Sequence, residues 1–242
     1  MGGTLVEQLW DRMRASGRVV EILVASALFA AGCSAPFHLS DEHVTSTPRP
    51  PSVDMRVLAC EPVPVLGVAA PSYIQGLSAT VSYALTVALV QGSPPIRVVP
   101  LPEVLNRLTD RGLAGEYAEL AAEYYRSGIL VRDRLQRIGA VLESRYLLQP
   151  GLAEFSQSLV DKFEITGLKV VKTRITVLRL WLQVWDMKTG HLLSESTGEL
   201  TAAAQIVRQD STVSLDEIAQ KLWSRIIREG LLAGSTGSPS CP

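Results

Sequence analysis

An alternating stretch, residues 174–185 (RITVLRLWLQVW), constrains the fold of this chain more than any other segment. Its even positions from 178 to 184 are all aliphatic, and its odd positions from 179 carry larger or polar side chains. Because successive side chains of a strand point to opposite faces, this period predicts a β-strand with one apolar face. The next five residues, DMKTG, predict a turn into a return strand over about 191–203, bulged near Gly198.

Helical periodicity lies on both sides of this strand pair in the sequence. An amphipathic helix is predicted from apolar positions at three- and four-residue steps: Ile74, Leu77, Val81, Ala84, Leu85, Ala88 and Leu89. Further helices are predicted over 101–108, 113–125 and 132–142. A last helix opens at Ser214, with Glu217 completing a capping box.

The other predicted strands are short. They cover 56–65, 96–99 and 145–149, with Pro150 and Gly151 turning or bulging the chain towards 152–155. Residues 156–172 fit either a strand and loop or a protruding hairpin. The predicted fold class is therefore α/β (α+β): a single mixed β-sheet of about five to six strands, packed by helices, with a C-terminal covering helix.

The beginning of the chain has the features of a lipoprotein signal peptide. Residues 22–31 form a short apolar run, and the small residue Gly32 precedes Cys33. The run is shorter than the ~20 residues that span a bilayer. We therefore expect cleavage between Gly32 and Cys33, with lipidation of Cys33, including palmitate. An uncleaved helix ending at an unmodified cysteine is the alternative. Translation from Met13 would give a more conventional leader than translation from Met1.

This interpretation divides the chain into four parts. Residues 1–32 are the signal peptide, and 33–54 are the lipidated cysteine and a flexible, proline-bearing tether. Residues 55–232 are a periplasmic α/β domain, and 233–242 are a disordered tail of small residues. Ser34, directly after the lipidated cysteine, favours the outer membrane under enterobacterial-type sorting. The expected location is thus the outer membrane, with the domain facing the periplasm.

Charge and composition exclude several classes of function. The formal net charge is −1, so no basic excess recruits nucleic acid. The three histidines are scattered and show no metal-ligand spacing, so no metal site is expected. No cofactor and no small-molecule substrate are predicted. Nucleophile motifs, phosphate loops and acid pairs are lacking, which predicts a protein that is not an enzyme. The acids at predicted strand ends, Glu61, Glu154 and Asp186, are interpreted as turn acids.

Two features stay open at the level of sequence. Cys60 and Cys241 form a disulfide in an exported protein, or Cys60 is a buried free thiol. The second face of the 174–185 strand combines large aromatic groups with hydrogen-bonding ones, which is typical of interaction hot spots. It carries Arg179, Trp181, Gln183 and Trp185 as candidate partner-binding residues; the alternative is that helices cover this face and the tryptophans are core. Tyr117, Tyr124, Tyr125 and Arg126 form a second candidate patch.

Four segments together resemble a family. They are RVLACEPV, RVVPLPEVLNRL, GILVRDRLQRIGAVLESRYLLQPGLAEF and LRLWLQVWDMKTGHLLSESTGE, within residues 55–231. These segments look like the periplasmic domain of curli-export-type lipoproteins. Relatives of that domain include lipoprotein activators of cell-wall synthases and the amino-terminal domain of the Tol-system propeller protein.

The resemblance implies a membrane-anchored, non-catalytic binding or assembly module of the bacterial envelope. Its partner is then an envelope protein or other copies of the chain. The alternative function is a subunit of an oligomeric curli-type secretion channel in the outer membrane, and an envelope hydrolase comes third. Against the channel, residues 156–172 are short, and Asp161, Lys162, Lys169 and Lys172 interrupt any lipid-facing band.

Overall fold

The computed structural model describes residues 39–48, 53–164, 169–205 and 214–232. All of them belong to one compact unit, His38–Pro242, and the other unit is Met1–Phe37. The predicted signal peptide, with Gly32, Cys33 and the alternative start at Met13, lies outside the described residues, as does the predicted tail.

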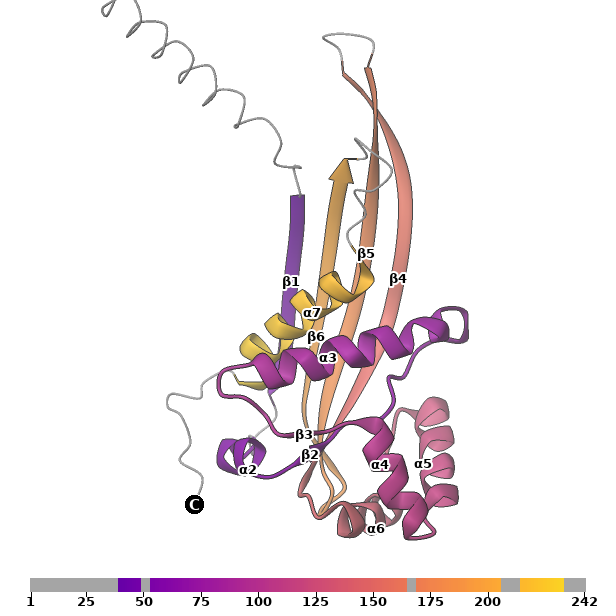
Figure 1. Ribbon diagram of the computed structural model, residues 1–242, viewed down its shortest axis with the longest axis vertical. Coiled ribbons are helices and arrows are strands. Elements are labelled where there is room, and N and C mark those ends of the chain that lie inside the picture. The colour runs from indigo at the N-terminus through magenta and orange to yellow at the C-terminus, as the bar shows by residue number, and fades with distance from the viewer. Residues whose placement is uncertain (1–38, 49–52, 165–168, 206–213, 233–242) are drawn as a thin grey trace, which may run out of the picture. The chain divides into compact units, whose positions relative to one another are not determined.

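Four long strands form an antiparallel sheet in the spatial order β1-β6-β5-β4 (Figure 1). Their bounds are β1 Leu39–Pro48, β4 Tyr146–Glu164, β5 Lys169–Asp186 and β6 His191–Gln205. A separate parallel pair, β2 Val63–Pro64 and β3 Val98–Val99, lies beside β4. Isolated parallel bridges from Val65 to Leu148 and from Ala69 to Gly151 connect this pair's segment to the edge of β4.

The predicted α/β class is confirmed, with one correction to the sheet. The described residues contain six strands, but these form two hydrogen-bonded sheets rather than one mixed sheet. The bridges to β4 involve single residue pairs, so the short parallel strands extend the sheet only locally. Sequence periodicity cannot show which of several short apolar runs pair with one another.

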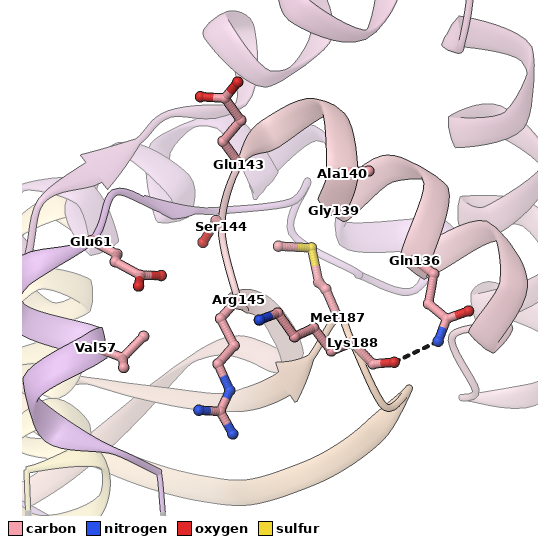
Figure 2. Close-up of a pocket in the computed structure, with 10 residues that line it drawn as sticks. All are labelled: Val57, Glu61, Gln136, Gly139, Ala140, Glu143, Ser144, Arg145, Met187 and Lys188. Atoms are coloured by element: carbon pink, nitrogen blue, oxygen red, sulfur yellow. Dashed lines mark hydrogen bonds between the residues drawn. The ribbon is translucent and has the colours of Figure 1, made fainter.

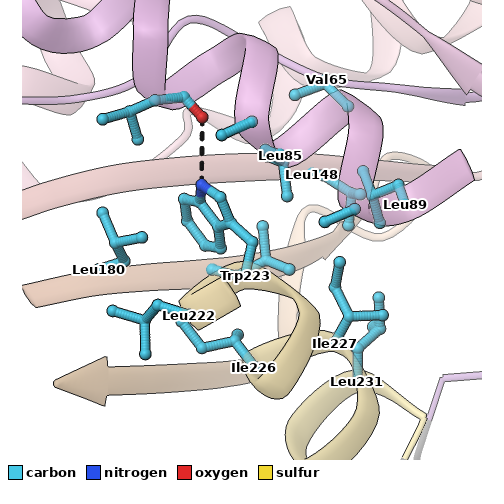
Figure 3. Close-up of a cluster of buried hydrophobic side chains, with 14 of the residues drawn as sticks. Val65, Leu85, Leu89, Leu148, Leu180, Leu222, Trp223, Ile226, Ile227 and Leu231 are labelled. Atoms are coloured by element: carbon cyan, nitrogen blue, oxygen red, sulfur yellow. Dashed lines mark hydrogen bonds between the residues drawn. The ribbon is translucent and has the colours of Figure 1, made fainter. Parts of the chain in front are cut away.

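The alternation of β5 is confirmed. Leu178, Leu180, Leu182 and Val184 are at most 1% exposed, and they form a core with two helices, α3 Ser78–Gln91 and α7 Leu215–Arg225. Trp223 of α7 is fully buried there, and its indole N–H donates to the Val81 carbonyl at 3.1 Å (Figure 3). The C-terminal helix therefore covers the sheet, as predicted. It continues as a π-helical segment, η2 Ile226–Leu231.

The predicted helix after Pro71 consists of a 3₁₀ turn, η1 Ser72–Leu77, followed by α3. Together they form one stretch, Ser72–Gln91, that is long and apolar enough to cross a membrane by length and composition alone. The core helix of a globular domain passes the same test. Val81, Leu85 and Leu89 are fully buried against the sheet and α7, which is the environment of a core helix.

Three helices pack on the opposite face at one end of the sheet (Figure 1). They are α4 Leu101–Asp110, α5 Ala114–Ser127 and α6 Arg132–Leu142, close to the predicted ranges. Helix α5 ends where Gly128 adopts a φ of 71°, a left-handed cap that glycine tolerates without strain. Because these helices stop part of the way along the strands, the rest of this sheet face has no helix over it among the described residues.

Residues 39–48 differ from the predicted flexible tether. They form strand β1, which pairs with β6 from Leu39 opposite Ala203 to Pro48 opposite Ser194. The segment is polar, but backbone hydrogen bonds to a neighbouring strand do not require apolar side chains. The hydroxyls of Thr45 and Thr197 also bond across the pair at 2.7 Å. Only residues 34–38 then remain between Cys33 and the folded sheet.

The predicted strand over 56–65 is also corrected. Its first part is a helix, α2 Met55–Cys60, and only Val63–Pro64 is strand. A short apolar run fits either a strand or a helix, and here a helical turn places Leu58 fully buried in the main core.

Cys60 is disulfide-bonded. Its partner lies outside the described residues, because Cys60 is the single cysteine within them.

Residues 156–164 and 169–172 are paired strands of a protruding hairpin, the second of the two predicted alternatives. Pro150 and Gly151 stay paired within β4, and the bulge of β4 comes later, between Leu152 and Glu154.

The predicted bulge at Gly198 is wrong, since the irregularity of the β5–β6 pair lies between Val184 and Trp185. A Cβ at Gly198 would lie 2.8 Å from side-chain atoms of Leu222 and Ile226, so this glycine instead permits close packing of the C-terminal helix.

The start of α7 matches the prediction in position but not in detail. Ser214 is the N-cap residue, yet its side chain makes no capping hydrogen bond to the helix backbone. The Asp216 carboxylate is hydrogen-bonded to Ser214, which lowers the pKa of Asp216. The capping box with Glu217 is therefore replaced by a local serine–aspartate pair.

Candidate functional site

The four candidate residues of β5 lie on one face, as predicted, but their environments differ along the strand. Trp185 is 5% exposed and belongs to the core under α4, α5 and α6. Gln183 is 9% exposed, Trp181 is partly buried, and the Arg179 side chain is 52% exposed. The face therefore changes from core to surface within seven residues, where the three helices stop (Figure 1).

Gln183 is the centre of a buried hydrogen-bond network. Its side-chain oxygen accepts from the Tyr124 hydroxyl at 2.8 Å and from the Trp185 indole N–H at 3.0 Å. Its amide nitrogen donates to the Glu195 carboxylate at 2.7 Å. Burial, together with the nearby Glu195 charge, raises the pKa of Tyr124, so the hydroxyl keeps its proton and stays a donor. Gln183 is thus positioned to support the face rather than to bind a partner directly.

Trp181 lies across the backbone of the neighbouring strand. A Cβ built on Gly151, its partner in β4, would lie 1.8 Å from the Trp181 ring. The ring also packs against Tyr124, with centroids 6.2 Å apart and planes tilted by 42°. The tryptophan is therefore fixed from two sides and forms the border between the core and the open face.

Arg179 lies on the open side of that border, between two carboxylates. Its guanidinium contacts Glu154 of β4 at 3.0 Å and Glu199 of β6 at 2.7 Å. Both acids stand opposite Arg179 in the strand register. We define the open sheet face as Glu154, Arg179, Trp181 and Glu199. Its charged groups are held in place by cross-strand pairs, and such pairs at an exposed site stabilise the fold only slightly.

The candidate patch of three tyrosines and Arg126 on α5 also consists of buried and exposed residues. Tyr124 is buried in the network above, and the Tyr117 hydroxyl accepts from the Gly67 amide at 3.4 Å. Burial raises the pKa of Tyr117. Tyr125 is 54% exposed, and the guanidinium of Arg126 bonds Glu123 on its own helix. Packing thus accounts for Tyr117 and Tyr124.

A cavity of about 630 Å³ opens between α2, the end of α6 and the turn after β5 (Figure 2). Its walls carry charges of both signs, from Glu61, Glu143, Arg145 and Lys188. The Arg145 side chain is held by Asp186 at 3.2 Å, and Asp186 also accepts the amides of Lys188 and Thr189 in the turn. Sequence analysis did not find this cavity, because it is assembled from three segments far apart in the chain.

The strand-end acids have separate surroundings. Asp186 organises its turn, Glu154 pairs with Arg179, and Glu61 lines the cavity. The described residues contain no group of three or more His, Cys, Asp or Glu side chains that could hold a metal ion.

Fold and site together describe a mixed α/β domain in which α3 and α7 pack on one sheet face and α4, α5 and α6 pack on one end of the other. No family model matches the chain, and no curated protein matches it. Among solved structures, the chain is similar to a PelC dodecamer from Paraburkholderia phytofirmans, with 15% identity and a TM-score of 0.44 over 77% of this chain and 95% of that one.

Two further solved structures are similar at a comparable level. Lipoprotein GNA1162 from Neisseria meningitidis has 14% identity and a TM-score of 0.40, over 69% of this chain and 96% of that one. The LpoB C-terminal domain from Salmonella enterica has 12% identity and a TM-score of 0.33, over 59% of this chain and 84% of that one. All three TM-scores lie below 0.5.

Proposed function

We propose that this chain is a lipid-anchored lipoprotein of the bacterial envelope, whose α/β domain is a non-catalytic binding or assembly module. The observation that carries the proposal is the apolar run that ends at Cys33, directly upstream of the folded sheet. A run of this length followed by small residues and a cysteine is typical of an export signal rather than of a membrane-spanning helix. The domain then acts on the outer membrane, facing the periplasm.

The disulfide of Cys60 supports export independently of the signal sequence. Disulfides persist in oxidising compartments such as the periplasm and are rare in the cytosol. The other cysteines of the chain are Cys33 and Cys241. Acylation occupies the thiol of Cys33, so under this proposal Cys241 is the partner of Cys60.

The mechanism of such a module is positional. The lipid holds the domain at the membrane, and because β1 begins at Leu39 the connection to it is short. The open sheet face then presents an aromatic border and an ordered set of charges to an envelope protein. Aromatic and arginine side chains together are typical of the centre of protein interfaces.

Replacement of Cys33 by alanine is expected to abolish incorporation of labelled palmitate in cells, because the acylated thiol is removed. The protein should move from the membrane fraction to the soluble or unprocessed fraction. Cys241→Ala is the matched control and should keep its label. Unchanged labelling of Cys33→Ala would reject the anchor.

Photocrosslinking in cells tests the docking face. A photoreactive residue at exposed Ser156, next to Glu154 on the same strand face, is expected to give a discrete adduct with an envelope protein. Arg179→Glu should reduce that adduct about tenfold or more, the effect of losing one hot-spot contact. A photoreactive residue at Arg228, 68% exposed on the helical side, is the control. Equal adducts at both positions, or an adduct indifferent to Arg179→Glu, would contradict the assignment.

The long β4–β5 hairpin favours a test of the second candidate, a subunit of a secretion channel. A channel requires a large closed ring, whereas a docking module does not. The native mass of detergent-extracted protein separates the two, and a mass of many subunits would select the channel.

A further inference from the structure

We propose that the end of the β4–β5 hairpin is a second membrane contact, which lies against the same lipid bilayer that holds the anchor. We define the hairpin end as residues 158–161 of β4 and 172–175 of β5, whose side chains the structure describes. The inference deepens the proposed function and rests on it, because the anchor at Cys33 is what places a bilayer at this end of the sheet.

The strand register places the start of β1 beside the hairpin end. Leu39 stands opposite Ala203 of β6, Ala203 opposite Ile175 of β5, and Ile175 opposite Ser158 of β4. From that level β4 runs on to Glu164. At about 3.4 Å per residue, this adds roughly 20 Å of strand beyond the point where β1 begins.

The length of chain before β1 matches this distance. Cys33 is six residues from Leu39, and six extended residues span at most about 20 Å. Because this span is an upper limit, the covalent connection allows the lipid attachment point to lie at any level from the start of β1, beside Ser158, to the end of β4 at Glu164. Helices α4, α5 and α6 lie at the other end, around the start of β4 (Figure 1).

The hairpin end carries apolar side chains that no other part of the described structure covers. Leu159 is 61% exposed and Val160 is 38% exposed. Neighbouring residues of a strand point to opposite faces, so an apolar group projects from each face of the hairpin. A flat protein partner would cover one face, whereas a hairpin end that enters the lipid headgroup region buries both.

Charge in this part of the sequence fits an anionic lipid surface. Residues 158–174 contain four basic residues, Lys162, Lys169, Lys172 and Arg174, and two acidic ones, Asp161 and Glu164. The segment is thus positively charged within a chain of net charge −1. Aliphatic side chains interspersed with lysine and arginine are typical of segments that lie in a membrane interface without spanning it. The same charged residues argue against a strand that crosses the bilayer, but they are compatible with a hairpin end that lies at the level of the lipid headgroups.

Vesicle flotation of the compact unit His38–Pro242 tests the proposal, because this unit lacks both the leader and the anchor. It is expected to float with vesicles of phosphatidylethanolamine and phosphatidylglycerol, and less with phosphatidylcholine or at high salt. Leu159→Glu combined with Val160→Glu should weaken binding about tenfold or more. Ile129→Glu, a matched change of an aliphatic residue 59% exposed between α5 and α6, should leave binding unchanged.

Absence of binding by the unchanged unit, or equal binding by the double variant, would overturn the proposal. The proposal would also be overturned if the double variant kept its vesicle binding and instead lost a protein that co-purifies with the unchanged unit. Circular dichroism of the double variant shows that it folds, as expected for two exposed positions. Palmitate labelling of the full chain reports on the anchor separately: a labelled Cys33 with no vesicle binding rejects the hairpin contact alone, and vesicle binding with an unlabelled Cys33 rejects the anchor alone.

Discussion

Replacement of Trp223 by alanine is expected to lower the free energy of unfolding by about 3–5 kcal/mol, the usual cost of removing a fully buried large aromatic residue. Trp223 is 0% exposed, and it joins α7 to α3 and to the covered face of the sheet (Figure 3). The change also leaves the Val81 carbonyl without the indole N–H as its donor. Domains of this kind are stable by only about 5–15 kcal/mol, so much of the total is lost. Urea unfolding followed by far-ultraviolet circular dichroism measures the difference.

Two variants separate the contributions of burial and hydrogen bonding at this position. Trp223→Phe keeps most of the apolar contact and loses the hydrogen bond, so it should cost about 1–3 kcal/mol. Tyr83→Ala, on the same helix α3 but 69% exposed, should change stability by no more than about 0.5 kcal/mol. A Trp223→Ala protein as stable as Tyr83→Ala would show that α7 does not pack on α3 as described.

Gly151→Ala is expected to destabilise the domain by about 3 kcal/mol, at the upper end for an overpacked site. The added methyl group would lie 1.8 Å from Cε2 of Trp181, a distance that no van der Waals contact allows. The ring must therefore leave its position, which also disturbs its contact with Tyr124. Chemical unfolding measures the loss. Loss of the crosslink from Ser156 in a still folded variant would further show that the tryptophan defines the open sheet face.

A second substitution tests whether the clash itself is the cause. Trp181→Leu makes space at this position, so the double variant Gly151→Ala, Trp181→Leu should be less destabilised than the sum of the two single changes. Gly115→Ala is the control, since nothing lies within 4 Å of its added Cβ in helix α5. It should stabilise the protein by about 0.5–1 kcal/mol, because glycine is a poor helix former. Additive losses at Gly151 and Trp181 would contradict the close contact.

The sequence predicted the candidate face because strand periodicity is a local property. Arg179, Trp181, Gln183 and Trp185 share one side of β5 for the same reason that Leu178 to Val184 share the other. How much of that side is covered depends on where α4, α5 and α6 pack, and their position is set by contacts with Leu147 and Trp185 that are distant in sequence. The carboxylates beside Arg179 likewise follow from the register of three strands.

The corrected elements have a common physical origin. Residues 39–48 have no apolar pattern, so only pairing with β6 makes them a strand. Residues 55–60 are apolar but too short to distinguish a helix from a strand, and the position of Leu58 in the core decides between them. In both segments the tertiary environment outweighs a weak local preference.

The amino-acid sequence by itself determined the α/β class, the central strand with its apolar face and the helix that covers it, and it is the basis of the predicted export signal. Each of these depends on residues adjacent in the chain or one helical turn apart. Tertiary structure alone decided that β1 joins the sheet, that the second face of β5 is only half covered, and that the hairpin ends on the side of the sheet where β1 begins. These features depend on strand register and helix packing between distant segments, which local periodicity does not encode.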